Sequence, residues 1–388
     1  MESLTHFWLT TGLTHITWEA IAMMGVGGVL LYMAIAREFE PIFLFSLGFS
    51  AILSHMPGST MAQPGGLLYL LYEVGVESGL FPALIFLGLG MLADFGPLIA
   101  MPSLLFVGAA AQTGIFVTLL IALVVSGWLG FPLDLASAAV VGMIGGANPP
   151  NMIFCADRLA PDLLGTIVVA LYASMALLHL FQPPVMRLLT TEQERRVVME
   201  PMRALSRWER VLFPLVLLLP CLLLLPAIAP LFGLLAFGNL LRESGVLERI
   251  MIGLSSTAQT RLLPIITLLF GLAVGGKLSA DRFFSLESVA IFLAGVVALS
   301  LGSVGGILMA KWLYHNGNGK VNPLIGAAGV AVVPLAARIA NKLAAEASFG
   351  GKETPNIFLL GHAMGANVAG VIGSMVAAGI LLTVLDGR

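Results

Sequence analysis

The chain is organised as long apolar stretches that alternate with short polar segments. A helix needs about 20 mostly apolar residues to cross a bilayer. The stretches that approach this length are 19–36, 41–56, 78–93, 103–129, 163–186, 211–232, 262–276, 283–303 and 367–385. The pattern predicts an all-α polytopic membrane protein with about ten transmembrane helices, folded as a single integral membrane domain over residues 1–388.

Shorter apolar pieces fill the gaps between these stretches. They are 64–76, 133–147, 151–160, 234–241, 304–314, 322–336 and 354–365. Several are too short to cross a bilayer alone. We interpret them as half-helices or re-entrant hairpins, because non-helical backbone at membrane depth survives only where protein covers it or where it lines a polar cavity.

Two apolar stretches contain the same tripeptide, Gly-Ala-Asn. One copy is Gly146-Ala147-Asn148, inside GGANPPN, and the other is Gly365-Ala366-Asn367, inside MGANVAG. Glycine, asparagine and proline weaken a helix, so we expect both stretches to break there. Broken helices in matching places of two halves are the best pointer in a sequence to the binding site of a carrier.

Spacing adds support for two repeats. From Gly108 in GAAAQTG to Gly146 is 38 residues, and from Gly326 in NPLIGAAGV to Gly365 is 39. Small residues allow helices to approach closely in lipid, so each Gly-Ala-Ala run is interpreted as part of a packing helix. The prediction is a first repeat over 78–186 and a second over 262–388.

Composition and charge placement agree with a membrane protein. Only 10% of the residues are charged and 58% are hydrophobic, whereas soluble domains carry about 25% charged residues. The net charge of −2 gives no electrostatic case for nucleic acid. Basic residues are absent from 38–157, but six of the 19 lie within 187–210, which we therefore predict to be a cytoplasmic loop of an inner-membrane protein.

The two asparagines of the expected breaks are the first candidates for chemistry. Asn148 and Asn367 offer carbonyl oxygens, the ligands that hard cations prefer. Ser374 follows Asn367 by two helical turns and so shares its face, and Asn151 closes the first break. A Na⁺ site is one interpretation. The alternative is that the asparagines only cap half-helices.

Other polar residues have weaker cases. Asp94 is either an intramembrane acid with a function or the cap of a wetted helix end. His179 and His362 are either packing residues or proton relays. Cys155 and Cys221 are isolated, which indicates packed thiols rather than a disulfide framework or metal cluster. The chain contains no phosphate loop, zinc-protease motif or nucleophile elbow.

Several long motifs, in order, resemble one family. They are DFGPLIAMP, GAAAQTGIF, HLFQPPVMRLLTTEQER, FGNLLRESGVLER, GKVNPLIGAAGV, PLAAR and HAMGANVAGVIGSMVAAG. They are similar to motifs of the β-subunit of sodium-transporting biotin-dependent decarboxylases, which include the oxaloacetate, methylmalonyl-CoA, glutaconyl-CoA and malonate enzymes. The resemblance runs from about residue 17 to the C-terminus.

The resemblance implies a helical carrier with re-entrant, inverted-repeat elements. It implies release of CO2 from carboxybiotin, coupled to Na⁺ export and to consumption of a proton. Na⁺ would bind this chain, whereas biotin would come only through a partner. The implied partners are a biotin-carrying carboxyltransferase α-subunit, a small membrane γ-type subunit and further copies of this chain in a trimer, all in contact with lipid. The family asparagine and Gly-Ser pair fall on Asn367, Gly373 and Ser374.

The chain departs from the family at two chemically important positions. GGANPPN stands where the family has GGADGPT, so Asn148 replaces an aspartate, and Ser174 replaces a tyrosine tied to proton delivery. Asparagine keeps a carbonyl oxygen but has neither charge nor titration. Asp94, Tyr172 and His179 are candidates for the missing carboxylate or proton group.

Three functional hypotheses follow. The first is a membrane subunit of a Na⁺-translocating decarboxylase, with Na⁺ at Asn148 and Asn367. The second is a divergent ion or solute carrier on the same scaffold, without decarboxylation. The third is a scaffold subunit that has lost transport, which explains the missing aspartate but not the retained Gly-Ala-Asn segments and Ser374.

Overall fold

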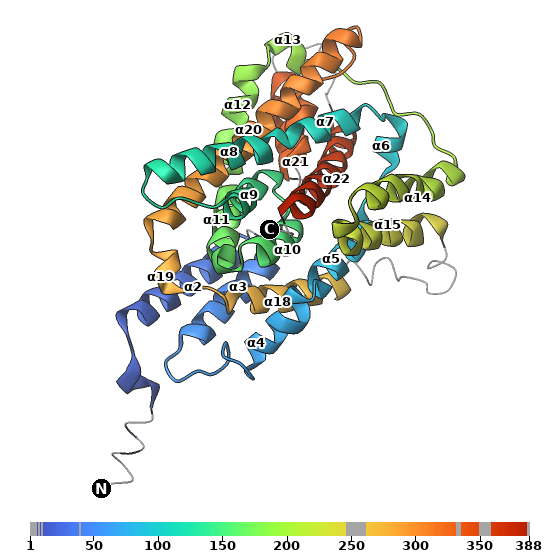
Figure 1. The fold of residues 1–388 in the computed structure, drawn as a ribbon. Coiled ribbons are helices and arrows are strands. Elements are labelled where there is room, and N and C mark those ends of the chain that lie inside the picture. Colours follow the sequence, from blue (N-terminus) through green and yellow to red (C-terminus); the bar gives the residue numbers. More distant parts are fainter. Residues whose placement is uncertain are drawn as a thin grey trace.

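The structure is a computed structural model that describes residues 6, 8, 11–38, 40–245, 261–330, 335–348 and 358–385. These residues form helices and contain no strand, which confirms the all-α class (Figure 1). The helices form two groups, which contact each other through α10 (Pro149–Leu159) and α11 (Leu164–Ala176). Short segments that link the helices are η1 Gly12–His15, α6 Gly96–Ala100, η4 Pro161–Leu163, η5 Pro226–Ile228 and α19 Ala280–Phe283. Helix α22 (Leu360–Leu385) contacts the linking segments α6 and η5.

The first group lies in the lower part and along the right side of Figure 1, and its helices pack pairwise. Helix α2 packs on α3, α3 packs on α18, and α15 packs on both α5 and α14. The members are α2 Trp18–Ala36, α3 Pro41–His55, α4 Leu67–Tyr72, η2 Glu73–Glu77, α5 Leu80–Leu92, α14 Arg207–Leu224, α15 Ala229–Ser244 and α18 Leu263–Gly275.

The second group surrounds the long helix α20, which contacts α7, α8, α11, α12 and η7. Its members are α7 Leu104–Ala111, α8 Thr113–Trp128, α9 Leu135–Met143, η3 Ile144–Gly146, α10 Pro149–Leu159, α11 Leu164–Ala176, α12 Leu178–Leu189, α13 Glu192–Arg195, α20 Leu286–Asn316, η7 Pro323–Gly329, α21 Leu335–Ser348 and α22 Leu360–Leu385.

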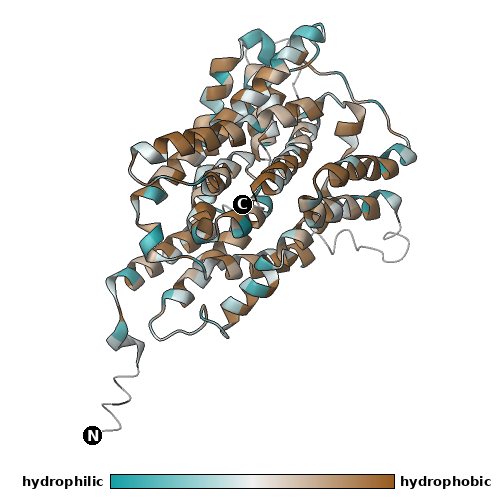
Figure 2. Ribbon diagram, in the orientation of Figure 1, coloured by the Kyte–Doolittle hydropathy of each residue, from teal (hydrophilic) through white to brown (hydrophobic). Residues whose placement is uncertain are grey.

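Four helical segments of the described residues are long and apolar enough to cross a membrane, namely Trp18–Ala36, Leu104–Trp128, Leu286–Asn316 and Leu360–Leu385. Two bent pairs, Leu67–Leu92 and Pro161–Leu189, raise the number to six if each is one span. Large apolar side chains are exposed on these and neighbouring helices, as lipid contact requires. In Figure 2 hydrophobic colour covers most helices, and hydrophilic colour gathers near α13. The chain is therefore a multi-pass membrane protein. The expected number of about ten transmembrane helices stays a prediction.

The first expected break is confirmed. Helix α9 tightens into the 3₁₀ turn η3, and Ala147 then adopts a left-handed conformation with φ of 42°. Pro149 and Pro150 follow at the start of α10, where a missing N–H costs nothing. Asn148, between the turn and the prolines, is only 4% exposed. We call Ile144–Asn148 the first break.

The second expected break is wrong in position. Helix α22 runs without interruption from Leu360 to Leu385, straight through Gly365–Asn367. No proline follows this Gly-Ala-Asn, so every helical hydrogen bond can form, and small residues favour close packing with other helices. The irregular segment of this half is instead the 3₁₀ element η7, Pro323–Gly329, which had been interpreted as part of a packing helix. We call η7 the second break.

The two breaks meet on a seam of small residues on α20. A Cβ placed on Gly302 would lie within 4 Å of the Gly145 carbonyl oxygen and the Val330 side chain, so both breaks reach this point. One turn further, a Cβ on Gly306 would fall on the carbonyl oxygen of Gly326. The absence of a side chain at Gly302 and Gly306 therefore allows both irregular segments to pack directly against the backbone of α20.

This packing generates a test. Gly306→Ala forces the backbone of η7 away from α20, and overpacking of this kind costs about 1–3 kcal/mol. We expect a lower melting temperature of the purified chain in detergent. Gly233→Ala on α15 is the matched control, because a Cβ there meets nothing within 4 Å, and it should leave the melting temperature unchanged or slightly raised. Equal behaviour of the two variants would contradict the seam.

Candidate ion-binding site

Helix α22 binds the first break through Ser374. The side-chain nitrogen of Asn148 donates to the Ser374 hydroxyl at 3.1 Å, and that of Asn151 donates to the Ser374 carbonyl oxygen at 2.9 Å. Asn151 and Ser374 are fully buried. Three of the residues selected from the sequence therefore lie together.

The same helix binds the second break through Asn367. Its side-chain nitrogen donates to the carbonyl oxygen of Ala328 in η7 at 3.3 Å, and the residue is 6% exposed. Asn367 and Ser374 are two turns apart, about 10 Å along the helix axis. Helix α22 therefore joins the two breaks, although it is itself unbroken.

A further amide, Gln112, was missed by the sequence reasoning. It lies at the junction of α7 and α8, and its nitrogen donates to the carbonyl oxygens of Gly108 at 2.9 Å and Gly370 at 3.3 Å. Its own oxygen is buried without a hydrogen-bond partner among the described residues, as is that of Asn151. The available signal was a lone amide in the apolar region 98–129, which had been interpreted only as a packing motif.

A charged cavity of about 250 Å³ opens between the two breaks. Ala147 of the first break and Val330 beside the second both line it. The polar residues in its wall are Arg37, Glu38, Glu40, His179 and Arg338. Their side chains form no hydrogen bond or ion pair within the described parts of the chain, so the cavity holds charges of both signs that are available to a ligand.

Backbone strain gathers at the wall of this cavity. Glu38, Glu40 and Ala147 all have positive φ, at 51°, 40° and 42°. A left-handed conformation is unfavourable for residues with a Cβ by about 1–2 kcal/mol each. Such strain is concentrated at functional sites, where the surrounding structure enforces it.

The remaining candidates from the sequence, His179, Tyr172 and Asp94, lie in three different places in the fold. His179 lines the cavity. Tyr172 is buried and stacks on Phe43, with 4.7 Å between ring centroids. Asp94 is exposed at the end of α5, and its carboxylate accepts from the Gly96 backbone N–H at 2.8 Å. The helix-end interpretation of Asp94 thus fits, and Asp94 makes no hydrogen bond to either break.

Ser174 occupies a space too small for the aromatic ring that the resemblance sets at this position. It is fully buried, and its hydroxyl donates to the carbonyl oxygens of Ala170 at 2.7 Å and Phe292 at 3.3 Å. A Cβ placed on Gly295 of α20 would overlap the Ser174 hydroxyl, so the α20 backbone lies directly against this serine. The serine therefore packs α11 against α20 instead of presenting a titratable group.

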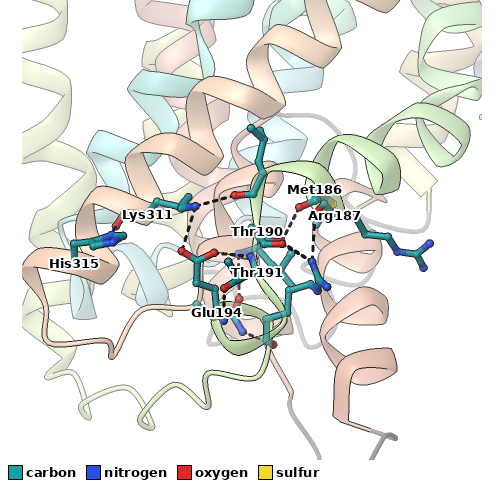
Figure 3. Close-up of polar contacts among 11 residues, drawn as sticks. Met186, Arg187, Thr190, Thr191, Glu194, Lys311 and His315 are labelled. Atoms are coloured by element: carbon teal, nitrogen blue, oxygen red, sulfur yellow. Dashed lines mark hydrogen bonds and ion pairs between the residues drawn. The ribbon is translucent and has the colours of Figure 1, made fainter.

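A polar network holds the charged loop 187–210 to helix α20 (Figure 3). Glu194 is buried in α13, caps it through Thr191, and pairs with Lys311 of α20 at 3.2 Å. The Lys311 ammonium also donates to the Leu189 carbonyl oxygen. Burial alone would raise the pKa of the Glu194 carboxyl, but hydrogen bonds from Thr191 and the charge of Lys311 hold that pKa below its ordinary value.

Asn322 connects this loop to the second break. Its side-chain nitrogen donates to the carbonyl oxygens of Arg195 at 3.0 Å and Val197 at 2.9 Å, and its oxygen accepts from the Leu324 backbone N–H at the start of η7. The residue is fully buried. One side chain thus fixes both the charged loop and the entry to the second break.

The side-chain oxygens offered at the two breaks are all neutral. The described residues contain no group of three or more His, Cys, Asp or Glu side chains that could hold a metal ion. Amide and hydroxyl oxygens at the breaks suit a weakly held, hard monovalent cation better than a transition metal.

An unwound, glycine-rich segment that is covered by protein and lined by amides is typical of binding sites in multi-pass membrane carriers. Comparison with known proteins identifies the family. A family model described as the Na⁺-transporting oxaloacetate decarboxylase beta subunit matches residues 19–385. The chain belongs to this family.

Individual relatives agree over nearly the whole length. The chain is 41% identical to a probable oxaloacetate decarboxylase beta chain of Vibrio cholerae, covering 100% of both proteins. It is 43% identical to the oxaloacetate decarboxylase beta chain 2 of Salmonella typhi, over 98% of this chain and 99% of that protein. It is 46% identical to the methylmalonyl-CoA decarboxylase subunit beta of Veillonella parvula, over 97% and 95%.

The Glu194 network has a defined pH dependence. Because the folded state lowers the pKa of this carboxyl from 4.5, its stabilisation is present above that value and is lost as pH falls through the lower folded value. We expect Glu194→Gln to lower the melting temperature at pH 7, with a difference that shrinks below pH 4.5. Glu192→Gln is the control, because its pair with Arg196 is exposed and should contribute little. A difference that is constant with pH would contradict the assignment.

Proposed function

We propose that this chain is the membrane subunit of a Na⁺-translocating decarboxylase, in which release of CO2 from carboxybiotin drives Na⁺ export. The observation that carries the proposal is the double attachment of α22, through Ser374 to the first break and through Asn367 to the second. Movement of either break alters the ligands that the other offers. Ion release can therefore be linked to an event at one side of the site.

The ion ligands in this proposal are the oxygens around Asn148, Asn151 and Ser374, while Asn367, about 10 Å away along α22, offers an oxygen at the second break. Na⁺ prefers oxygen ligands, as other hard cations do. Without the family aspartate the ion is held by dipoles alone, so its affinity is lower than in a site with a carboxylate. The capping role of the asparagines is compatible with this, since their nitrogens anchor the helices and their oxygens are then oriented by the same bonds.

The charged cavity is the proposed entrance for the carboxylated substrate. Guanidinium groups bind carboxylates by charge-assisted hydrogen bonds, and Arg37 and Arg338 both line the cavity. His179 stands in the same wall, and an imidazole can take up and release a proton, so it can supply the proton that decarboxylation consumes. Tyr172 and Asp94 have no position in this scheme that their contacts support.

The acyl substrate of the complex is set by a partner. Relatives named for oxaloacetate and for methylmalonyl-CoA are similarly close, at 43% and 46% identity. A shared β-subunit chemistry, acting on carboxybiotin alone, accounts for this. The proposal includes a biotin-carrying α-subunit, a small γ-type membrane subunit, a trimeric assembly, and a bacterial inner membrane with the charged loop 187–210 on the cytoplasmic side.

We further propose that the two halves are inverted repeats. Each half has a long apolar helix, then a segment with a 3₁₀ break, then another long apolar element. In the first half these are α7–α8, α9–η3–α10 and α11–α12, and in the second they are α20, η7–α21 and α22. The common order supports a duplication and a span count larger than the four to six found by length.

A divergent carrier that works without decarboxylation is the second candidate, and the neutral residues Asn148 and Ser174 favour it. One experiment separates the two. The chain is isolated from its native membrane, and biotinylated partners are identified. It is then placed in liposomes, and Na⁺ flux is measured with and without carboxybiotin. Flux that requires carboxybiotin supports the first proposal, whereas flux by the chain alone supports the carrier. A scaffold without transport shows neither.

Asn148→Asp should increase Na⁺ affinity and make it pH-dependent. The Ser374 hydroxyl accepts a hydrogen bond from Asn148 and can rotate to donate to a carboxylate instead. The carboxylate is protonated at low pH, so the affinity of the variant should rise from pH 6 to pH 8. The unaltered chain should show a flat profile, because these ligands do not titrate. Isothermal titration with Na⁺ measures both, and identical flat affinities would remove Asn148 from the site.

A further inference from the structure

The oxygen of Gln112 has a fixed direction. Gln112 is 5% exposed, and its side-chain nitrogen is held by two carbonyl oxygens, one on α7 and one on α22. Both hydrogens of the amide nitrogen are therefore used. The amide oxygen must point the other way, and it has no hydrogen-bond partner among the described residues.

That oxygen faces the first break. A Cβ built on Gly146 would lie 3.6 Å from the Gln112 oxygen and 3.0 Å from the Ser374 Cβ. The unpaired oxygen thus stands beside Ser374, the residue that binds Asn148 and Asn151. Because Gly146 has no side chain, nothing of its own fills the space in front of the amide.

Asn151 repeats the arrangement of Gln112 next to Ser374. Its nitrogen is bound to the Ser374 carbonyl oxygen, and its oxygen is buried without a partner in the described part of the chain. A buried acceptor without a hydrogen bond costs about 1–3 kcal/mol. Two such acceptors beside one helix turn are a cost that a bound cation would remove.

We propose that the Gln112 and Asn151 side-chain oxygens are direct ligands of the transported cation, and that the ion site extends to the α7–α8 junction. This rests on the proposed function, and it assigns Gln112 to the site. All of the named ligands are neutral. Such a set can compensate the desolvation of one positive charge more readily than of two, so the site is selective for a monovalent alkali cation over Ca²⁺ or Mg²⁺.

The first helix group supplies a matched control. Asn239 on α15 is fully buried, its nitrogen donates to the carbonyl oxygens of Gly90 and Ala93, and its oxygen is also unpaired. It therefore shares the local chemistry of Gln112. However, its partners lie on α5 and at its end, and neither break contacts it.

The experiment measures Na⁺ affinity of the purified full-length chain in nanodiscs by isothermal titration at pH 8. Gln112→Met keeps the side-chain length but removes the oxygen, and should weaken Na⁺ binding about tenfold or more, as expected for one lost ligand. Asn239→Leu should leave the affinity unchanged. If Gln112→Met fails to fold, Asn151→Leu tests the second ligand with the same expectation.

The outcomes separate this inference from the proposed function. Unchanged Na⁺ affinity in Gln112→Met, together with weaker binding in Ser374→Ala, overturns the role of Gln112 and leaves the decarboxylase proposal standing. Equal loss in Gln112→Met and Asn239→Leu shows a packing effect and also overturns it. Absence of Na⁺ binding to the unaltered chain overturns both. Ca²⁺ binding as tight as that of Na⁺ overturns the selectivity.

Discussion

The structure depends on one constraint, which is that carbonyl and N–H groups released where helices break must be bonded inside an apolar environment. Water is not available there, so side chains of neighbouring helices do this. At the second break the donors are primary amides, since Gln182 and Asn367 donate to the carbonyl oxygens of Ala327 and Ala328. Two further amides, Gln112 and Asn151, attach neighbouring segments to carbonyl oxygens of the unbroken helix α22, at Gly370 and Ser374. An amide that gives its nitrogen to the backbone must direct its oxygen elsewhere. The same amide side chains therefore stabilise the breaks through their nitrogens and supply the oxygens that line the site.

Helix packing makes this bonding possible. The side-chain nitrogen of Gln182 donates to the Ser303 hydroxyl on α20 at 3.1 Å as well as to η7, so a single residue joins three elements. Such short bonds need backbones in contact, and the glycine seam of α20 provides that contact. A long, regular helix is the platform on which the irregular segments rest, and α22 closes them from the opposite side.

The sequence was informative where local residues alone determine the backbone. Two glycines followed by Ala147, Asn148 and two prolines leave the chain no helical alternative, and the first break was predicted correctly. Gly365–Asn367 has the same tripeptide without prolines, so tertiary packing decides, and α22 stays helical. The second break follows Asn322-Pro323, where proline restrains the preceding residue, a signal that the repeated tripeptide concealed. The charged cavity could not be predicted, because Arg37, Glu40 and Arg338 are brought together by folding alone.

The contact between Ser174 and Gly295 limits the side chains that position 174 can accept. Ser174 fills the room available beside α20, and the small residue opposite it leaves no margin for an aromatic ring. Overpacking of a well-filled interior is destabilising. Substitution of Ser174 by tyrosine would therefore destabilise the packing of α11 against α20, and this position can hold a larger side chain only with compensating changes on both helices.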